Sequence, residues 1–185
     1  LDGTLSESGE GILWCVRRTI EDLKIVVPEN FRLESFIGPP LADSFYRLGL
    51  DDEKVKLGVK TYKSYYDTKG KYMNKAYDGI KELLERLREK GYKLGVATSK
   101  YELFARQIID NIGLLQYFDF VSGATANAER QKKIDVLNYG IKNLGATPEN
   151  SALIGDTKFD AEGARLCGCG FVGVLYGYGT RKEME

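Results

Sequence analysis

The chain has 185 residues, of which 43% are hydrophobic and only four are prolines, and its 27 basic residues balance 27 acidic ones. This length and composition suit one globular domain or a core with a small insertion, and they exclude a disordered or fibrous chain. A formal net charge of zero gives no whole-surface field for nucleic acid or an anionic membrane, so we expect neither as a partner.

The cysteines and the hydropathy pattern bear on the compartment. Three cysteines, Cys15, Cys167 and Cys169, form an odd set in a chain of ordinary size, which favours reduced thiols and a cytoplasmic location. No apolar stretch approaches the roughly 20 residues that cross a bilayer, and no signal peptide is visible. We therefore expect no membrane association.

The first elements in chain order are a turn and a helical segment. Asp2 stands in a Gly-Thr turn of a kind that normally follows a buried hydrophobic strand, so we expect such a strand before Leu1. From about Glu10 to Lys75 the pattern favours helices, with no convincing strand. The apolar residues that recur there at helical spacing are Ile12, Leu13, Val16, Ile20, Leu23, Val55, Val59, Tyr62 and Tyr66.

From Asp78 onward, short apolar strands alternate with amphipathic helices. The predicted helices are Asp78–Lys90, Glu102–Ile112, Lys133–Leu144 and Ala161–Cys167, and the predicted strands are Lys93–Thr98, Phe118–Ser122, Ser151–Ile154 and Phe171–Leu175. This alternation is typical of a doubly wound α/β fold with a parallel, Rossmann-like sheet. The predicted core is residues 1–7 plus 76–185, and residues 8–75 form an all-helical insertion.

The candidate site residues follow the predicted strands. Ligands bind at the carboxyl ends of strands in open parallel sheets, and Thr98, Asp156 and Asp160 all lie at such ends. The two aspartates offer the hard oxygen ligands that Mg²⁺ prefers, while a threonine hydroxyl and a lysine such as Lys133 suit a phosphate. The chain has no histidine, which excludes histidine-based triads and histidine zinc sites.

Four segments together resemble the ordered motifs of the haloacid dehalogenase superfamily. They are Asp2-Gly3-Thr4-Leu5, the apolar run that ends in Thr98, the lysine Lys133, and Gly155-Asp156 followed by Asp160. The match is closest to the branch of phosphoglycolate phosphatases and 5′-nucleotidase-like phosphatases, and it covers essentially the whole chain.

The resemblance implies a role for each matching residue. A nucleophilic aspartate is expected immediately before Leu1, with Asp2 as the general acid and base. Thr98, Ser99, Gly3 and Arg130 would bind the substrate, Lys133 would neutralise its phosphate, and Asp156 and Asp160 would hold Mg²⁺. The implied reaction is hydrolysis of a small phosphomonoester, such as phosphoglycolate or a nucleoside monophosphate, through an aspartyl-phosphate. Residues 8–75 would be the cap domain over the site.

Several residues have a second, structural interpretation. Asp2 could be only a turn residue, Ser99 could cap the helix that follows it, and Asp160 could be a helix N-terminal residue favoured by the helix dipole. Lys132 lies beside Lys133, and we prefer Lys133 because it stands one residue before an apolar run. Cys167 and Cys169 indicate a helix end, capped by Gly168 or Gly170, in preference to a redox pair.

Two alternatives to a phosphatase stay open. The same scaffold supports phosphomutases and other phosphotransferases, whereas the acidic pair argues against a dehalogenase, which needs no metal. A non-catalytic phosphate-binding homologue is expected if the nucleophile is truly absent.

Overall fold

A computed structural model describes residues 1–126 and 129–185 of the chain. The contacts divide the described residues into two compact units, one formed by residues 1–7 with 75–185 and the other by residues 8–74. The chain passes between the units twice, and at this point Ser6–Glu7 (β1) pairs in antiparallel register with Lys75–Ala76 (β2).

The larger unit contains every strand and helix that was predicted from Asp78 onward, each with ends within three residues of those expected. Its helices are α4 (Ile80–Glu89), α5 (Glu102–Asn111), α6 (Lys133–Asn143), α7 (Lys158–Cys167) and α8 (Arg181–Met184), and its longer strands are β3 (Gly95–Tyr101), β4 (Phe120–Ala124), β5 (Ala152–Gly155) and β6 (Gly170–Gly173). The α/β prediction is therefore confirmed, and the short α8 and the β1–β2 pair were not expected.

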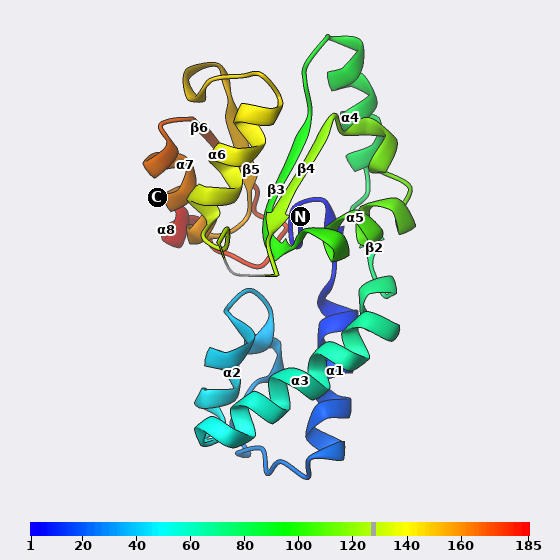
Figure 1. The fold of residues 1–185 in the computed structure, drawn as a ribbon, viewed down its shortest axis with the longest axis vertical. Helices are drawn as coiled ribbons and strands as arrows, with labels where there is room; N and C mark the ends of the chain where they lie inside the picture. The colour runs from blue at the N-terminus through cyan, green and yellow to red at the C-terminus, as the bar shows by residue number, and fades with distance from the viewer. Residues whose placement is uncertain (127–128) are drawn as a thin grey trace. The chain divides into compact units, whose positions relative to one another are not determined.

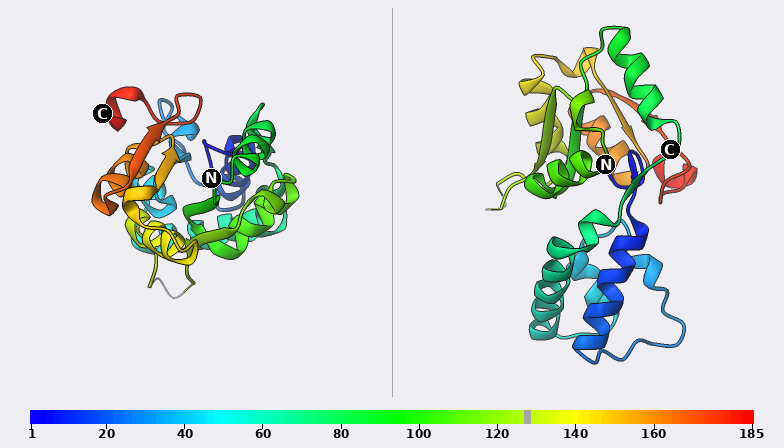
Figure 2. Two further views of the ribbon diagram at one scale, coloured as in Figure 1. Left: turned by 90° about the horizontal axis from the view of Figure 1, so that it is seen from above. Right: turned by 90° about the vertical axis from the view of Figure 1, so that its right-hand side faces the viewer.

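The parallel strands form two pairs in place of one continuous sheet. β3 pairs with β4, and β5 pairs with β6, both in parallel register. Helices α5 and α6 pack on the first pair and α7 packs on the second, as expected of β-α-β crossovers. Figure 1 shows the two pairs, and in the view from above the N-terminus lies between them (Figure 2). The opening loop reaches the ends of β3 and β5, because Asp2 contacts Lys100 and Thr4 contacts Asp156.

Two hydrophobic clusters hold these layers together. One cluster joins α4, β3, α5 and β4 through Leu84, Val96, Ile109 and Val121, and the other lies among α6, β5 and α7. Leu1 and Leu5 pack against the first cluster, which anchors the opening loop on the hydrophobic core.

The smaller unit is helical, as the sequence predicts. It contains α1 (Gly9–Asp22), α2 (Leu41–Arg47) and α3 (Asp52–Thr68), and residues 8–74 include no strand. α1 and α2 both pack on α3, and Cys15, Val16, Phe45 and Tyr62 of these helices are buried. Nowhere in 1–126 or 129–185 is a helix both long and apolar enough to pass through a bilayer.

The cysteine pair near the C-terminus lies at a helix end. α7 ends at Cys167, and Gly168 follows it as the C-cap with φ +80°, a left-handed conformation that glycine adopts at low cost. All three cysteines are free thiols. Burial and the neighbouring Cys169 raise the pKa of Cys167 to about 11, so its thiol stays protonated at neutral pH. The helix-end interpretation is confirmed.

Candidate active site

Asp156, which follows β5, is held by two segments that are far apart in sequence. The Thr4 hydroxyl donates a hydrogen bond to Asp156 Oδ1 at 2.8 Å, and the backbone N–H of Tyr178 donates to Oδ2 at 2.9 Å. The residue is only 1% exposed. Because a buried carboxyl group without hydrogen-bond donors would be costly, these two bonds offset part of the cost of burying Asp156.

The backbone around Asp156 is packed too closely for side chains. Gly3 has φ +74°, and a Cβ added to it would lie 2.0 Å from Asp156 Oδ2. Gly177 and Gly179 meet Asp156 just as closely from the other side. The glycines of the opening turn and of the loop after β6 are therefore required by the position of this carboxylate.

Lys133 and Asp160 form a buried ion pair. Lys133 Nζ lies 2.8 Å from Asp160 Oδ1, and the two side chains are 14% and 10% exposed. Asp160 Oδ2 accepts hydrogen bonds from the backbone N–H and the hydroxyl of Thr157, which closes the first turn of α7. Asp160 thus occupies the helix N-terminal position that the sequence offered as its alternative role.

The surroundings of Asp160 keep it ionised. Burial by itself would raise the pKa of Asp160, but the charge of Lys133, with its hydrogen bond and that of Thr157, holds the pKa below the usual value. Gly155 permits this arrangement, because a Cβ there would lie 2.4 Å from the Asp160 Cβ. Glycine at position 155 is therefore required by the close approach of Asp160.

Lys133 also connects this ion pair to β3. Its ammonium group donates to the carbonyl oxygen of Ala97 at 3.3 Å, directly before Thr98. Thr98 is 5% exposed, and its hydroxyl oxygen accepts a hydrogen bond from the backbone N–H of Lys100. The structure therefore brings the predicted threonine and lysine to the same edge of the β3–β4 pair.

Asp2 has a partner that the sequence did not identify. Lys100 Nζ lies 3.3 Å from Asp2 Oδ1, with the two side chains 15% and 25% exposed. The position of Lys100, directly after Thr98 and Ser99 at a predicted strand end, was the sequence signal that could have identified it as a site residue. The pair links the opening turn to the end of β3.

Four of the predicted residues act on one common group. The charges of Lys133, Asp2, Asp160 and Asp156 all affect the pKa of the backbone nitrogen of Leu1, which burial lowers first of all. These four side chains therefore lie within electrostatic reach of the start of the opening loop.

Ser99 and Lys132 lie outside this constellation. β3 continues to Tyr101, so Ser99 is within the strand and exposed, and α5 begins at Glu102 without a side-chain cap. The prediction that Ser99 caps α5 is wrong, because the strand runs on past it. Lys132 is exposed at the start of α6, whereas Lys133 points into the site.

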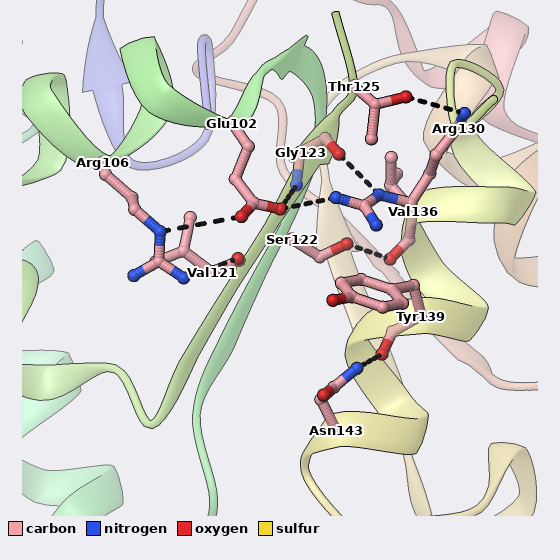
Figure 3. A network of polar contacts seen from close by, with 10 residues as sticks. All are labelled: Glu102, Arg106, Val121, Ser122, Gly123, Thr125, Arg130, Val136, Tyr139 and Asn143. Atoms are coloured by element: carbon pink, nitrogen blue, oxygen red, sulfur yellow. Dashed lines mark hydrogen bonds and ion pairs between the residues drawn. The ribbon is translucent and has the colours of Figure 1, made fainter. Parts of the chain in front are cut away.

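Arg130 lies in a separate network (Figure 3). Its guanidinium donates to Glu102 Oε2 and to the Gly123 carbonyl, each at 2.7 Å, and stacks 3.8 Å from the centroid of the Tyr139 ring. Glu102 Oε2 also accepts the backbone N–H of Gly123. The network ties the start of α5 and the end of β4 to the segment that leads into Lys133, and it gives Arg130 a structural setting unlike the substrate contact expected of it.

A double-mutant cycle tests that setting. We expect Glu102→Gln and Arg130→Met each to lower the free energy of unfolding and to couple by about 1–2 kcal/mol, because the two side chains share hydrogen bonds. Urea unfolding of the single and double variants measures this coupling. If Arg130 instead contacts substrate, Arg130→Met should raise KM while Glu102→Gln leaves KM unchanged, and the two changes should act independently on stability.

The carboxylates of Asp156 and Asp160 fit a magnesium ion that takes only some of its ligands from the protein. Proteins hold Mg²⁺ with one or two carboxylates, and waters and substrate phosphates complete the octahedron. Each oxygen of Asp156 accepts one hydrogen bond in the contacts described above and keeps a lone pair for a ligand. Asp160 is already paired with the ammonium group of Lys133 through Oδ1, and its Oδ2 accepts two hydrogen bonds from Thr157. Among residues 1–126 and 129–185, no three histidine, cysteine or acidic side chains gather as a metal cluster. Asp156 therefore suits direct ligation, and Asp160 a supporting place.

Comparisons with known proteins point to one family. The family model described as haloacid dehalogenase-like hydrolase matches residues 1–174. The chain is 36% identical to tyrosine-protein kinase PtkA of Mycobacterium tuberculosis over 97% of its own length and 61% of that protein, so it spans less than two thirds of this relative.

Other relatives are covered more fully. A 5′-nucleotidase of Pseudomonas aeruginosa is 36% identical, with 100% of this chain and 84% of that protein aligned. The structure of a haloacid dehalogenase-like family hydrolase from Streptococcus pneumoniae superposes with a TM-score of 0.90 at 32% identity, over 100% of this chain and 86% of that one.

Proposed function

This chain belongs to the haloacid dehalogenase-like hydrolase family, and from that premise we propose that it is a magnesium-dependent phosphatase that acts on a small phosphomonoester. The observation that carries the proposal is that the opening turn contacts Asp156 through Thr4, while Lys133 pairs with Asp160 and reaches the strand end beside Thr98. The family resemblance expects the nucleophilic aspartate immediately before Leu1.

Each residue has a part in the proposed reaction. The nucleophile attacks phosphorus to form an aspartyl-phosphate, while Asp2 gives its proton to the leaving alkoxide and later takes one from the attacking water. Lys133 and the Thr98 hydroxyl bind the equatorial phosphate oxygens, and Lys133 offsets their charge. Asp156 is the ligand for Mg²⁺, which when bound supplies positive charge to the phosphoryl group.

Chelation is the most direct test of the proposal. We expect hydrolysis of p-nitrophenyl phosphate by the full-length protein to stop in EDTA and to return when excess Mg²⁺ is added. Without the ion, the carboxylate of Asp156 holds no positive charge that could offset the charge of the phosphate. Hydrolysis that EDTA leaves unchanged would contradict the metal dependence. Binding of vanadate or phosphate without turnover would instead indicate the non-catalytic homologue.

The substrate class is narrowed by the relatives. Relatives named 5′-nucleotidase and phosphoglycolate phosphatase support a nucleoside monophosphate or a small phosphorylated acid as the substrate. A comparison of kcat/KM across a panel of both classes, with a sugar phosphate included, tests this assignment. A sugar phosphate that exceeded both classes by tenfold would overturn it.

The similarity to a tyrosine-protein kinase favours a second candidate, a phosphotransferase. An aspartyl-phosphate can pass its phosphoryl group to a hydroxyl other than water, so the same residues would serve both reactions. Incubation with γ-labelled ATP and a tyrosine-containing peptide separates the two. Label on the peptide indicates the transferase, and release of inorganic phosphate alone indicates the phosphatase.

A further inference from the structure

The loop after β6 carries a tyrosine whose hydroxyl reaches the opening turn. The Tyr176 hydroxyl donates to the carbonyl oxygen of Thr4 at 2.9 Å. Thr4 in turn donates its own hydroxyl to Asp156 Oδ1 at 2.8 Å. A chain of two hydrogen bonds therefore runs from the phenol of Tyr176, through one residue of the opening turn, to the proposed magnesium ligand.

The same loop holds Asp156 from its other side. The backbone N–H of Tyr178 donates to Asp156 Oδ2. Position 177 requires glycine, because a Cβ there would lie 2.3 Å from the Gly3 carbonyl oxygen. Any residue except proline at position 178 supplies that N–H. The bond from position 176 requires a phenol, because it comes from the side chain.

A second tyrosine fixes the orientation of Tyr176. The rings of Tyr77 and Tyr176 lie with centroids 4.8 Å apart at an angle of 56°, and the Tyr77 backbone N–H donates to the Leu5 carbonyl at 3.1 Å. Burial raises the pKa of both phenols, and Asp156 raises that of Tyr176 further, so the Tyr176 hydroxyl remains a donor at neutral pH.

We propose that Tyr176 is a positioning residue for the magnesium ligand, acting through Thr4 to fix the carboxylate of Asp156. The proposal rests on the proposed function for the identity of the ion. Groups that orient a metal ligand raise the affinity of the site for the metal as well as fixing the position of the ligand. A ligand side chain that must be ordered when the metal binds costs free energy. Loss of the phenol hydroxyl should therefore weaken Mg²⁺ binding without removing a ligand.

The test measures Mg²⁺ binding by isothermal titration calorimetry in the full-length protein without substrate. Tyr176→Phe should raise the Kd for Mg²⁺ by about 3–10-fold, less than the 10–100-fold typical of direct partners of a ligand, since Tyr176 acts one residue further away. At saturating Mg²⁺, kcat should return to within twofold of the unsubstituted protein. Tyr92→Phe, at a tyrosine that is 59% exposed, is the matched control and should leave the Kd unchanged.

A second variant checks the route of the effect. Thr4→Val removes the hydroxyl between the two partners, so it should raise the Kd by itself, and adding Tyr176→Phe to it should raise the Kd no further. Unfolding midpoints measured in EDTA report any merely structural effect, which would lower stability and leave the Kd alone.

The outcomes separate the two proposals. If the unsubstituted protein binds Mg²⁺ and the Kd of Tyr176→Phe is within twofold of its Kd, the proposed role of Tyr176 is wrong and the proposed function stands. If the unsubstituted protein binds no Mg²⁺, the metal site of the proposed function fails and this inference fails with it. Additive effects of Thr4→Val and Tyr176→Phe would overturn the route through Thr4.

Discussion

Asp2→Asn is expected to lower kcat by about two to four orders of magnitude, the usual contribution of a positioned acid–base group. The asparagine keeps the size of the side chain but can neither protonate the leaving alkoxide nor accept a proton from water. The turn itself should survive, because asparagine is as well suited to it as aspartate. Mg²⁺ binding by Asp156 should be retained.

The leaving group makes this prediction more specific. p-Nitrophenolate leaves without protonation, so Asp2→Asn should still form the aspartyl-phosphate from p-nitrophenyl phosphate and then hydrolyse it slowly. We expect a burst of one equivalent of p-nitrophenolate in stopped flow, followed by a slow steady state. An alkyl phosphate, whose alkoxide needs the proton, should show no burst.

The matched control is Asp110→Asn, at an exposed aspartate of α5. It should leave the burst and the steady state unchanged. A kcat for Asp2→Asn within threefold of the unsubstituted protein would show that Asp2 is only the turn residue of the alternative interpretation.

The sequence predicts the elements that carry the site because their signals are local. The alternation of apolar strands with amphipathic helices, and glycine at strand ends, give β3, β5, α6 and α7 to within three residues. The positions of Thr98 and Asp156 follow, since each lies near the carboxyl end of a parallel strand, β3 or β5, where ligands bind, and Lys133 is the first residue of α6. These residues lie where the motif order placed them.

The contacts between segments could not be predicted in the same way. Thr4 and Asp156 are 152 residues apart, and Tyr176 and Thr4 are 172 apart, so no periodic pattern relates them. Arg130 is another such case, because the family resemblance implied a substrate contact, whereas in the structure its guanidinium contacts Glu102 and Tyr139. Ser99 was expected after the end of the strand, but β3 pairs with β4 again at Tyr101, after an irregularity in register between Ala97 and Tyr101, which no local sequence pattern predicts.

Lys133→Met has the second large expected effect, and it acts on stability and turnover together. Without the ammonium group, the charge on phosphate is no longer offset, and kcat/KM should fall by about 10²–10³-fold. Asp160 would also be left as a buried carboxylate without its cation, which costs up to about 3–5 kcal/mol of unfolding free energy.

The pH dependence of stability should change sign with this substitution. In the unsubstituted protein the pKa of Asp160 is lowered, so its contribution is full above the ordinary aspartate pKa and is lost as the pH falls through the lowered value. In Lys133→Met, burial dominates and raises the pKa of Asp160, so stability should decline as the pH rises. The two proteins should therefore differ most near neutral pH and least in acid.

A double variant separates the two roles of Lys133. Lys133→Met with Asp160→Asn removes both charges, and the asparagine oxygen can still accept the Thr157 N–H, so unfolding free energy at pH 7 should recover most of the loss. Turnover should not recover, because the phosphate still lacks its cation. Lys132→Met is the matched control at the adjacent exposed lysine and should change neither property. Recovery of turnover in the double variant, or loss of turnover in Lys132→Met, would show that Lys133 does not serve the phosphate.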